Sequence, residues 1–314
     1  TSEDLLYAVP VPEQAGVSNT TVTMNAASMN NSGFEFSATY RNRDRDFKYE
    51  LSANLSTLRN RVTSLGFGTD SYISGAYITN VGQEIGQFYG WAYEGIARTQ
   101  EDLDNHATQE GAQIGDCLYK DISGPDGKPD GKVDANDQVV LGSGMPKIHF
   151  GLNARFEYKR FDLSIATFGA LNYHVSDDIY NSLNSCYGWG NKEVGMLDAN
   201  RFSEDGSTYL SNVPRTYVTN SASLGWNDLF SSRKIQNAAY WKIANVELGY
   251  NFPNEWFGKY VSDVRFYVSA QNLHTFTGYH GYNVDYAGGT FTPGYNFCSY
   301  PTARTFMCGV HFTF

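Results

Sequence analysis

The sequence is poor in cysteine, proline and positive charge, and it lacks any long apolar run. It contains 4 Cys and 9 Pro in 314 residues, and 23 Lys and Arg against 33 Asp and Glu give a formal net charge of −10. No stretch approaches the roughly 18 consecutive apolar residues of a membrane-spanning helix, so such a helix is excluded. The acidic balance provides no basic patch to neutralise phosphates, which argues against nucleic acid as a partner.

The cysteines are far apart and include no C-x-x-C pair, so a metal cluster held by thiolates is not expected. Cys186 and Cys298 lie in loop-like segments and could form a disulfide in an oxidising compartment. Cys308 alternates with Phe306 and Val310 and is interpreted as a small apolar residue.

Aromatic residues are abundant, with 23 Tyr and 20 Phe. Apolar and polar residues alternate in segments of about ten residues, which is the length of a transmembrane β-strand. In the last segment, Phe306, Val310 and Phe314 share one face, and Met307 and His311 share the other. The same period recurs at residues 34–40, 47–55, 148–158, 161–165, 244–250 and 264–270. Such strands average to a polar composition, which agrees with the mean hydropathy of −0.43.

Alternation alone fits either a soluble β-sandwich or a membrane barrel, and three further features favour the barrel. Short turns at 41–46, 159–160 and 254–262 alternate with long segments at about 64–78, 100–145, 172–233 and 277–302. Aromatic residues cluster near expected strand ends, at 88–91, 240–241 and 256–257, as in the girdles at membrane interfaces. The chain also stops on an aromatic residue within its last strand. We therefore predict an all-β fold, a transmembrane antiparallel β-barrel in which the long segments are extracellular loops.

Several segments resemble the SusC/RagA-type TonB-dependent outer-membrane transporters of Bacteroidetes. They occur in family order along nearly the whole chain: DLLYAVPVP at 4–12, NAASMNNSGFE at 25–35, VGQEIGQFYG at 81–90, DCLYKD at 116–121, NAAYWKI at 237–243, AQNL at 270–273, and the closing strand from Tyr300 to Phe314. The resemblance implies a plugged barrel of about 22 strands. Residues 1–314, with roughly eight to ten strands, would form its C-terminal part.

The resemblance also implies what this chain would work with. The N-terminal plug domain, the segment that contacts TonB and the first barrel strands are expected upstream of Thr1, in agreement with the lack of a signal peptide. A SusD-like surface lipoprotein is expected to cap the extracellular mouth and to dock on the long loops. The protein is then expected in the outer membrane, as a multi-pass barrel surrounded by lipid, with Phe314 as part of a C-terminal assembly signal.

An Asp-rich segment follows the spacing of a calcium-binding loop. Asp126, Asp130, Gly131, Asp134 and Asp137 occupy positions one, five, six, nine and twelve. Lys128 departs from the pattern at position three, where an acid or amide is expected, and Asp137 replaces the usual Glu. The predicted structural Ca²⁺ site comprises Asp121, Ser123, Asp126, Asp130, Lys132, Asp134 and Asp137. The alternative is a surface cluster of Asp and Gly turns without metal.

Aromatic residues in the long loops are candidate substrate contacts. The faces of sugar rings stack on such side chains, and neighbouring amides and carboxylates bind hydroxyls. The candidates are Tyr187, Trp189, Trp226, Tyr279, Tyr282, Tyr286 and Tyr295, and the alternative is that they pack the loops together. Arg155, Glu157, Glu247 and Arg265 are expected to be partners in internal ion pairs.

No constellation in the sequence indicates catalysis. The six His show no metal-ligand spacing, no G-x-S-x-G motif is present, and no two carboxylates are placed at a defined separation. The predicted function is therefore TonB-dependent import of a nutrient, expected to be an oligosaccharide, without chemistry on the substrate. The alternatives are a peptide importer of the same family and, from another class, a calcium-stabilised surface adhesin or glycan-binding protein.

Overall fold

The computed structural model describes residues 1–10, 21–66, 68–185, 191–197, 203–216, 225–257, 261–285, 288–297 and 299–314. Of these, the side chains of Asp4, 6–10, 21–24 and Ala26 are not described.

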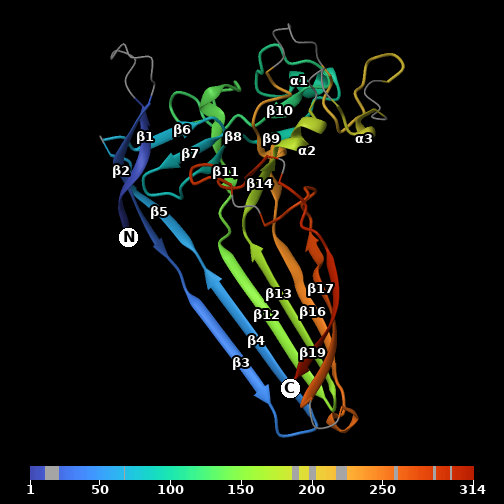
Figure 1. Cartoon of the computed structure of the whole chain (residues 1–314). Helices are drawn as coiled ribbons and strands as arrows, with labels where there is room; N and C mark the ends of the chain where they lie inside the picture. The colour runs from blue at the N-terminus through green and yellow to red at the C-terminus, as the bar shows by residue number, and fades with distance from the viewer. Residues whose placement is uncertain are drawn as a thin grey trace.

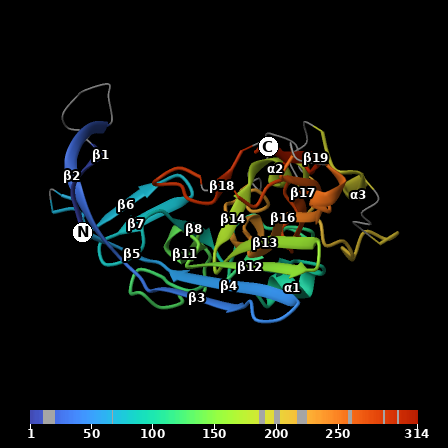
Figure 2. The same ribbon diagram turned by 60° about the horizontal axis from the view of Figure 1, so that its bottom comes forward.

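One antiparallel sheet of seven strands dominates the molecule, in the order β19-β17-β16-β13-β12-β4-β3 (Figure 1). Its strands are β3 (Glu35–Asn42), β4 (Phe47–Thr57), β12 (Ile148–Tyr158), β13 (Phe161–Leu171), β16 (Tyr240–Asn251), β17 (Asp263–Thr277) and β19 (Thr305–Thr313). Neighbours in the sheet are also neighbours in chain order, with the long segments inserted between them. Viewed from below, the strands follow one another across an open, curved wall (Figure 2).

The pairing register confirms the alternation predicted from the sequence. Apolar side chains form rows across all seven strands, as in the row Tyr40, Leu51, Ala154, Ile165, Val246, Ala270 and Phe306. The adjacent row, on the other side of the pleat, is polar except at Ala166: Thr39, Ser52, Asn153, Ala166, Asn245, Gln271 and Thr305. The sheet therefore has an apolar face and a polar face.

A second sheet, β1-β2-β5, continues the first one. It consists of β1 (Ser2–Pro10), β2 (Thr21–Ser32) and β5 (Arg59–Ser64). From the pair Met29–Val62 onward, the β2–β5 pairing has the same register as the β3–β4 pairing, as in Ser32–Arg59 and Phe36–Leu55. The two-stranded ribbon formed by β2–β3 and β4–β5 therefore keeps its register where one sheet passes into the other. Gly33 is needed at this junction because a Cβ there would lie 1.9 Å from the Thr57 carbonyl oxygen. With β2–β3 and β4–β5 each counted as one strand, the wall has eight strands in the part of the chain that the structure describes, within the predicted eight to ten.

The two ends of the wall differ (Figure 1). At the turn end, the connections are short: residues 43–46, the pair Lys159 and Arg160, and the segment between β16 and β17. At the loop end, the long segments pack together, and they are not irregular as a loop prediction implies. They contain β6 (Ser71–Ser74), β7 (Tyr77–Asn80), β8 (Gln87–Trp91), β9 (Tyr93–Ile96), β10 (Cys117–Tyr119), β11 (Gln138–Ser143), β14 (His174–Asp177), β15 (Gln236–Asn237) and β18 (Tyr295–Asn296), with α1 (Gln100–Asp104), α2 (Asp178–Leu183) and α3 (Val194–Leu197).

The predicted aromatic clusters divide between these parts of the molecule. Trp241 lies at the loop end of β16 and Trp256 at the turn end, and both are exposed. The cluster at 88–91 was wrongly placed at a membrane interface. It belongs to β8, where Phe88 is fully buried and stacks on Phe230 at 5.9 Å within the loop assembly. Among the described residues, no helix is long and apolar enough to cross a membrane, a finding that concerns helices alone.

Candidate functional site

The loop end holds most of the predicted site residues, and a buried ion pair ties three of its segments together. The Asp116 carboxylate is fully buried. Its two oxygens accept hydrogen bonds from Arg215 Nε at 2.5 Å and Nη2 at 3.1 Å. Asn227 Nδ2 and the Gln113 backbone N–H also donate to this carboxylate, at 2.7 and 2.9 Å. Because residues about 100 positions apart in the chain meet here, this pair joins the loops into one body.

The segment between β17 and β19 folds back onto the wall and is anchored at two points. Lys242, on the polar face of β16, is almost fully buried, and its Nζ lies 2.6 Å from Asp285 Oδ2. The Tyr279 hydroxyl donates to Asp177 Oδ2 at the start of α2 and accepts from Asn296 Nδ2 at 2.8 Å. Burial, followed by the nearby Asp177 carboxylate, raises the pKa of Tyr279. Tyr279 thus remains a neutral hydroxyl that can donate at physiological pH.

In the Asp-rich segment, backbone amides occupy most of the carboxylate oxygens. Asp121 accepts from the N–H groups of Asp130 and Gly131, at 3.3 and 2.7 Å. Asp137 accepts from Ile122, Ser123 and Asp134 at 2.6 to 2.9 Å. Burial would raise the pKa of Asp137, but these hydrogen bonds outweigh it and lower the pKa.

The other predicted ligands of the segment do not gather around one point. Asp130 Oδ1 and Asp134 Oδ1 accept from the N–H groups of Lys132 and Asn136, and Asp126 is exposed. Within the described residues, no three acidic, His or Cys side chains converge as a metal-binding group. This geometry matches the turn cluster weighed as the alternative, and calcium binding stays a prediction from the spacing.

Of the predicted substrate-contacting aromatics, the four that the structure describes do not form one surface. Tyr279 is buried in the network described above, and Trp226 packs on Tyr119 and donates its indole N–H to the Glu110 carbonyl at 2.8 Å. Tyr282 is 67% exposed and Tyr295, in β18, is 37% exposed, so both are accessible. Tyr187, Trp189 and Tyr286 lie outside the described residues, as do Cys186 and Cys298.

A hollow of about 590 Å³ opens beside α2, and the sequence analysis did not identify it. Its polar lining includes both charge signs, and Phe297, which is 62% exposed, contributes an aromatic ring. The lining residues are Asp178, Ile179, Asn181, Ser182, Leu183, Ser185, Asn191, Lys192, Asp228, Lys234 and Phe297. They come from three separate segments, so only the folded chain brings them together.

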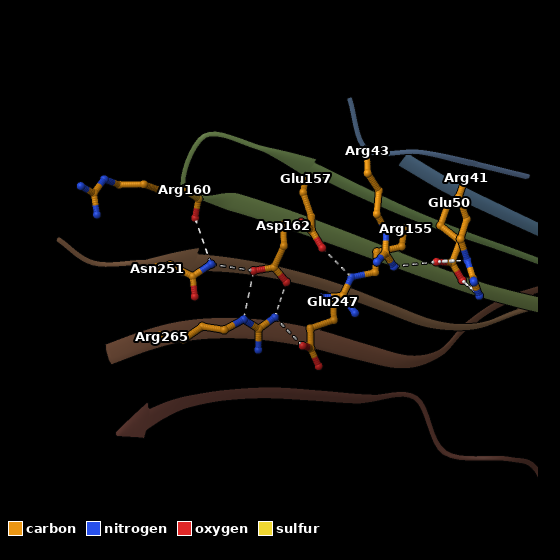
Figure 3. A network of polar contacts seen from close by, with 10 residues as sticks. All are labelled: Arg41, Arg43, Glu50, Arg155, Glu157, Arg160, Asp162, Glu247, Asn251 and Arg265. Carbon is orange, nitrogen blue, oxygen red and sulfur yellow. Dashed lines mark hydrogen bonds and ion pairs between the residues drawn. The ribbon is translucent and has the colours of Figure 1, made fainter. Parts of the chain in front are cut away.

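A second group of polar side chains lies on the polar face near the turn end (Figure 3). The predicted ion-pair partners are confirmed: Arg155 Nε lies 3.1 Å from Glu157 Oε1, and Arg265 Nη2 lies 2.7 Å from Glu247 Oε1. The sequence analysis missed Asp162, which binds the Arg265 guanidinium through both carboxylate oxygens at 2.5 and 3.0 Å. On the neighbouring strands, Glu50 pairs with Arg41 at 2.7 Å and with Arg43 at 3.5 Å. All of these groups lie on or beside the polar face of one wall (Figure 3).

Comparison with known proteins gives relatives along the entire chain. The chain is 30% identical over 332 aligned residues to TonB-dependent receptor P3 of Formosa agariphila, and 25% identical to TonB-dependent receptor SusC of Bacteroides thetaiotaomicron. Both alignments cover 100% of this chain, but 31% and 29% of the relatives. The chain therefore spans about a third of their length. No family model matches the sequence.

Solved structures show the same fold. The structure of the RagAB peptide transporter superposes with a TM-score of 0.77 at 22% identity, covering 99% of this chain and 32% of that one. The same importer in its open-open state superposes with a TM-score of 0.73. From end to end, this chain resembles SusC/RagA-type TonB-dependent transporters and has the all-β antiparallel fold of the C-terminal part of their barrel.

Proposed function

We propose that this chain forms part of the wall and the outer loops of an outer-membrane transporter that imports a nutrient with energy from the TonB system. The observation that carries the proposal is the two-faced sheet. Leu51, Leu152, Leu248 and Val310 are 41 to 49% exposed on the face that a soluble protein would bury. Lipid is the medium in which such a face is stable, and the polar face would line the lumen. The proposed energy source, the TonB system, is inferred from the relatives, which are named TonB-dependent receptors.

Uptake by cells tests the import function. The full-length protein is expressed in its host, and accumulation of labelled oligosaccharides and oligopeptides is followed with and without a functional TonB. We expect TonB-dependent accumulation of one cargo class. Equal uptake in cells that lack this protein would contradict the proposal.

The cargo is proposed to be an oligosaccharide, with a peptide as the second candidate. The exposed rings of Tyr282 and Phe297 support the first cargo, because sugar faces stack on them. The hollow beside α2 supports the second, since Lys192 and Asp178 in its lining suit the opposite charges of a peptide. Binding measurements with a neutral glycan and a zwitterionic peptide distinguish the two: Lys192→Gln is expected to weaken peptide binding and leave glycan binding unchanged.

A SusD-like lipoprotein is the proposed partner on the loop end. Val194, Tyr282, Phe297 and Tyr300 are 62 to 88% exposed there, and a lid would cover such apolar side chains. Copurification with a tagged full-length protein tests this. A single tagged species without a lipoprotein in detergent extracts would argue against a stable lid.

A surface adhesin stabilised by calcium is the alternative from another class. Two measurements separate it from the barrel. A barrel requires detergent and migrates on gels in a heat-dependent manner, whereas an adhesin domain is soluble without detergent.

Terbium luminescence tests the calcium site. The Trp91 indole N–H donates to the Asp134 carbonyl at 3.0 Å, so Trp91 can sensitise terbium bound in the Asp-rich segment. The calcium prediction expects terbium emission that Ca²⁺ displaces and Asp130→Asn weakens, and no emission would refute it.

A further inference from the structure

The apolar face of the wall ends at its loop end in two arginines, Arg59 and Arg61 of β5. Between the pair Met29–Val62 and the turn end, the register of the ribbon formed by β2–β3 and β4–β5 is unbroken, so the odd-numbered residues of β4 and of β5 up to Arg61 share one face. Leu51 and Leu55 therefore point to the same side as Arg59 and Arg61. Their neighbours on the opposite side, Asn60 and Val62, are buried against the loop assembly.

The position of the two arginines matches a membrane interface. β4 contributes 11 residues, Phe47–Thr57, to the wall, which is about one bilayer crossing for a tilted strand. Arg59 follows directly beyond this span. The next outward-facing pairs of the ribbon are Ser32–Arg59 and Asn30–Arg61, so the surface changes from apolar to cationic within two residues.

The charges of this pair have no partner within the described part of the chain. Both side chains are exposed, and neither guanidinium takes part in an ion pair or a side-chain hydrogen bond. β5 and its neighbour β2 contain no Asp or Glu, and the acids of this sheet, Glu3 and Asp4, lie on β1, one strand farther away. By contrast, Arg41, Arg155 and Arg265 on the polar face are all paired with carboxylates.

We propose that Arg59 and Arg61 form a binding site for the phosphate groups of lipids in the leaflet at the loop end. Same-face residues two apart on a strand are separated by about 7 Å, so two guanidinium groups can hold one phosphorylated head group. The apolar side chains directly below, Phe34 at 85% and Leu55 at 44% exposure, would lie along the acyl chains of the same lipid. The site rests on the proposed membrane placement, but not on import.

Lipid binding to the full-length protein in neutral detergent tests the site. Diphosphoryl lipid A and phosphatidylcholine are titrated, and the R59Q/R61Q variant is compared with wild type and with R41Q/R155Q. The control removes the same two charges from strand positions on the opposite face. Each Arg near a charged lipid surface contributes about 1 kcal/mol, so R59Q/R61Q is expected to bind lipid A about thirtyfold more weakly. R59K/R61K should keep most of the affinity, and the control should bind within about twofold of wild type.

Several outcomes would overturn the proposal. Equal lipid A binding by R59Q/R61Q and wild type would remove the arginines from the site. Equal binding of phosphatidylcholine, whose phosphate charge is balanced by choline, would remove the requirement for a net negative phosphate group. Displacement of lipid A by inorganic phosphate at the concentration of the lipid would identify a free-phosphate site instead. Heat-dependent gel migration, measured in parallel, shows that each variant is folded. Because this test measures no uptake, a failed import assay leaves its result standing. Absence of lipid A binding by the wild-type protein would overturn this site alone and not the proposed import.

Discussion

Two charged side chains that are almost completely buried, Asp116 and Lys242, hold the loop end together, and each is neutralised by one partner. A buried charge is tolerated when it is paired and its remaining hydrogen-bond capacity is used. Asp116 meets both conditions through Arg215, Asn227 and a backbone N–H. Single residues therefore decide whether segments distant in sequence form one body.

Asp116→Asn should open the loop assembly locally. The substitution leaves Arg215, whose side chain is only 17% exposed, without its counter-charge. Loss of one partner of a buried pair costs about 3 kcal/mol. Hydrogen exchange measures this as faster exchange of the amides at 112–117 and 208–216. Asp126→Asn, an exposed acid in a neighbouring segment, is the matched control, and equal exchange in both variants would contradict the assignment.

His174 makes the packing of β14 dependent on pH. Burial, and then the charge of Lys147, lower the pKa of His174 from its ordinary value of 6.5. The unfolded segment therefore binds more protons than the folded one as the pH falls below 6.5, so His174 adds its full share of stability above that pH and loses it below. The protection factors of the β14 amides, which correct for the slower intrinsic exchange at lower pH, should fall between pH 6.5 and 5. His174→Asn should abolish this fall, and an unchanged pH profile of the protection factors in the variant would refute the role.

At the scale of elements, the wall strands have one regular pairing pattern, and the connections at the loop end do not. Each wall strand pairs with its chain neighbours in one register, whereas the inserted segments form small sheets of their own. The long connection after β17 is the clearest case, because it returns to the wall through Lys242 and to α2 through Tyr279. Such a connection can be released from the wall without unfolding the wall itself.

Lys242→Met should release the segment after β17 from the wall. The methionine preserves the apolar stem but leaves Asp285, which is 29% exposed, without its partner at 2.6 Å. Asp285 can turn to water, so the segment is expected to be cleaved about tenfold faster by limited proteolysis at 280–290, at a cost of about 1 to 2 kcal/mol. Lys242→Met combined with Asp285→Asn should restore part of the protection. Equal cleavage of wild type and Lys242→Met would show that the ion pair does not anchor the segment.

At the scale of the whole molecule, the two faces of one sheet require two different environments. Residues one position apart in the same strand lie on opposite faces, so they provide a direct test. Leu152 is 47% exposed in the middle of β12, and Asn153 follows it on the polar face. A soluble sandwich and a membrane barrel both tolerate a charge better at Asn153 than at Leu152, so the measurement has to report assembly in lipid.

Leu152→Arg should impair membrane assembly, and Asn153→Arg should not. An arginine on the lipid face near the middle of the bilayer costs about 2 to 4 kcal/mol, whereas the lumen face accepts it. The measurement is the fraction of protein that shows heat-dependent gel migration after folding into lipid vesicles. A larger loss for Asn153→Arg than for Leu152→Arg would mean that the polar face is the one in contact with lipid.

Sequence reasoning identified the strands of the seven-stranded sheet, their faces and the ion-pair partners Arg155, Glu157, Glu247 and Arg265, and the relatives agree with the family that it named. It was less successful where the signal is not periodic. It did not predict β1, β2 and β5 or the short strands and helices within the long segments, assigned Phe88 to a membrane interface, and missed both Asp162 and the hollow beside α2. Neither a calcium ion nor a substrate contact is established for the residues it proposed.

The sequence alone determined the two faces of the wall, because a strand repeats every two residues and its neighbours in the sheet are also its neighbours in the chain. Only the tertiary structure decided the pairing of Asp116 with Arg215, the anchor at Lys242 and the lining of the hollow. The two ion pairs join residues 99 and 43 positions apart, and the hollow joins three separate segments, with no periodic pattern between them. The same holds for Arg59 and Arg61. Their spacing in the sequence gives no signal that distinguishes them from other surface arginines. The pairing register of β2–β3 with β4–β5 places them on the apolar face.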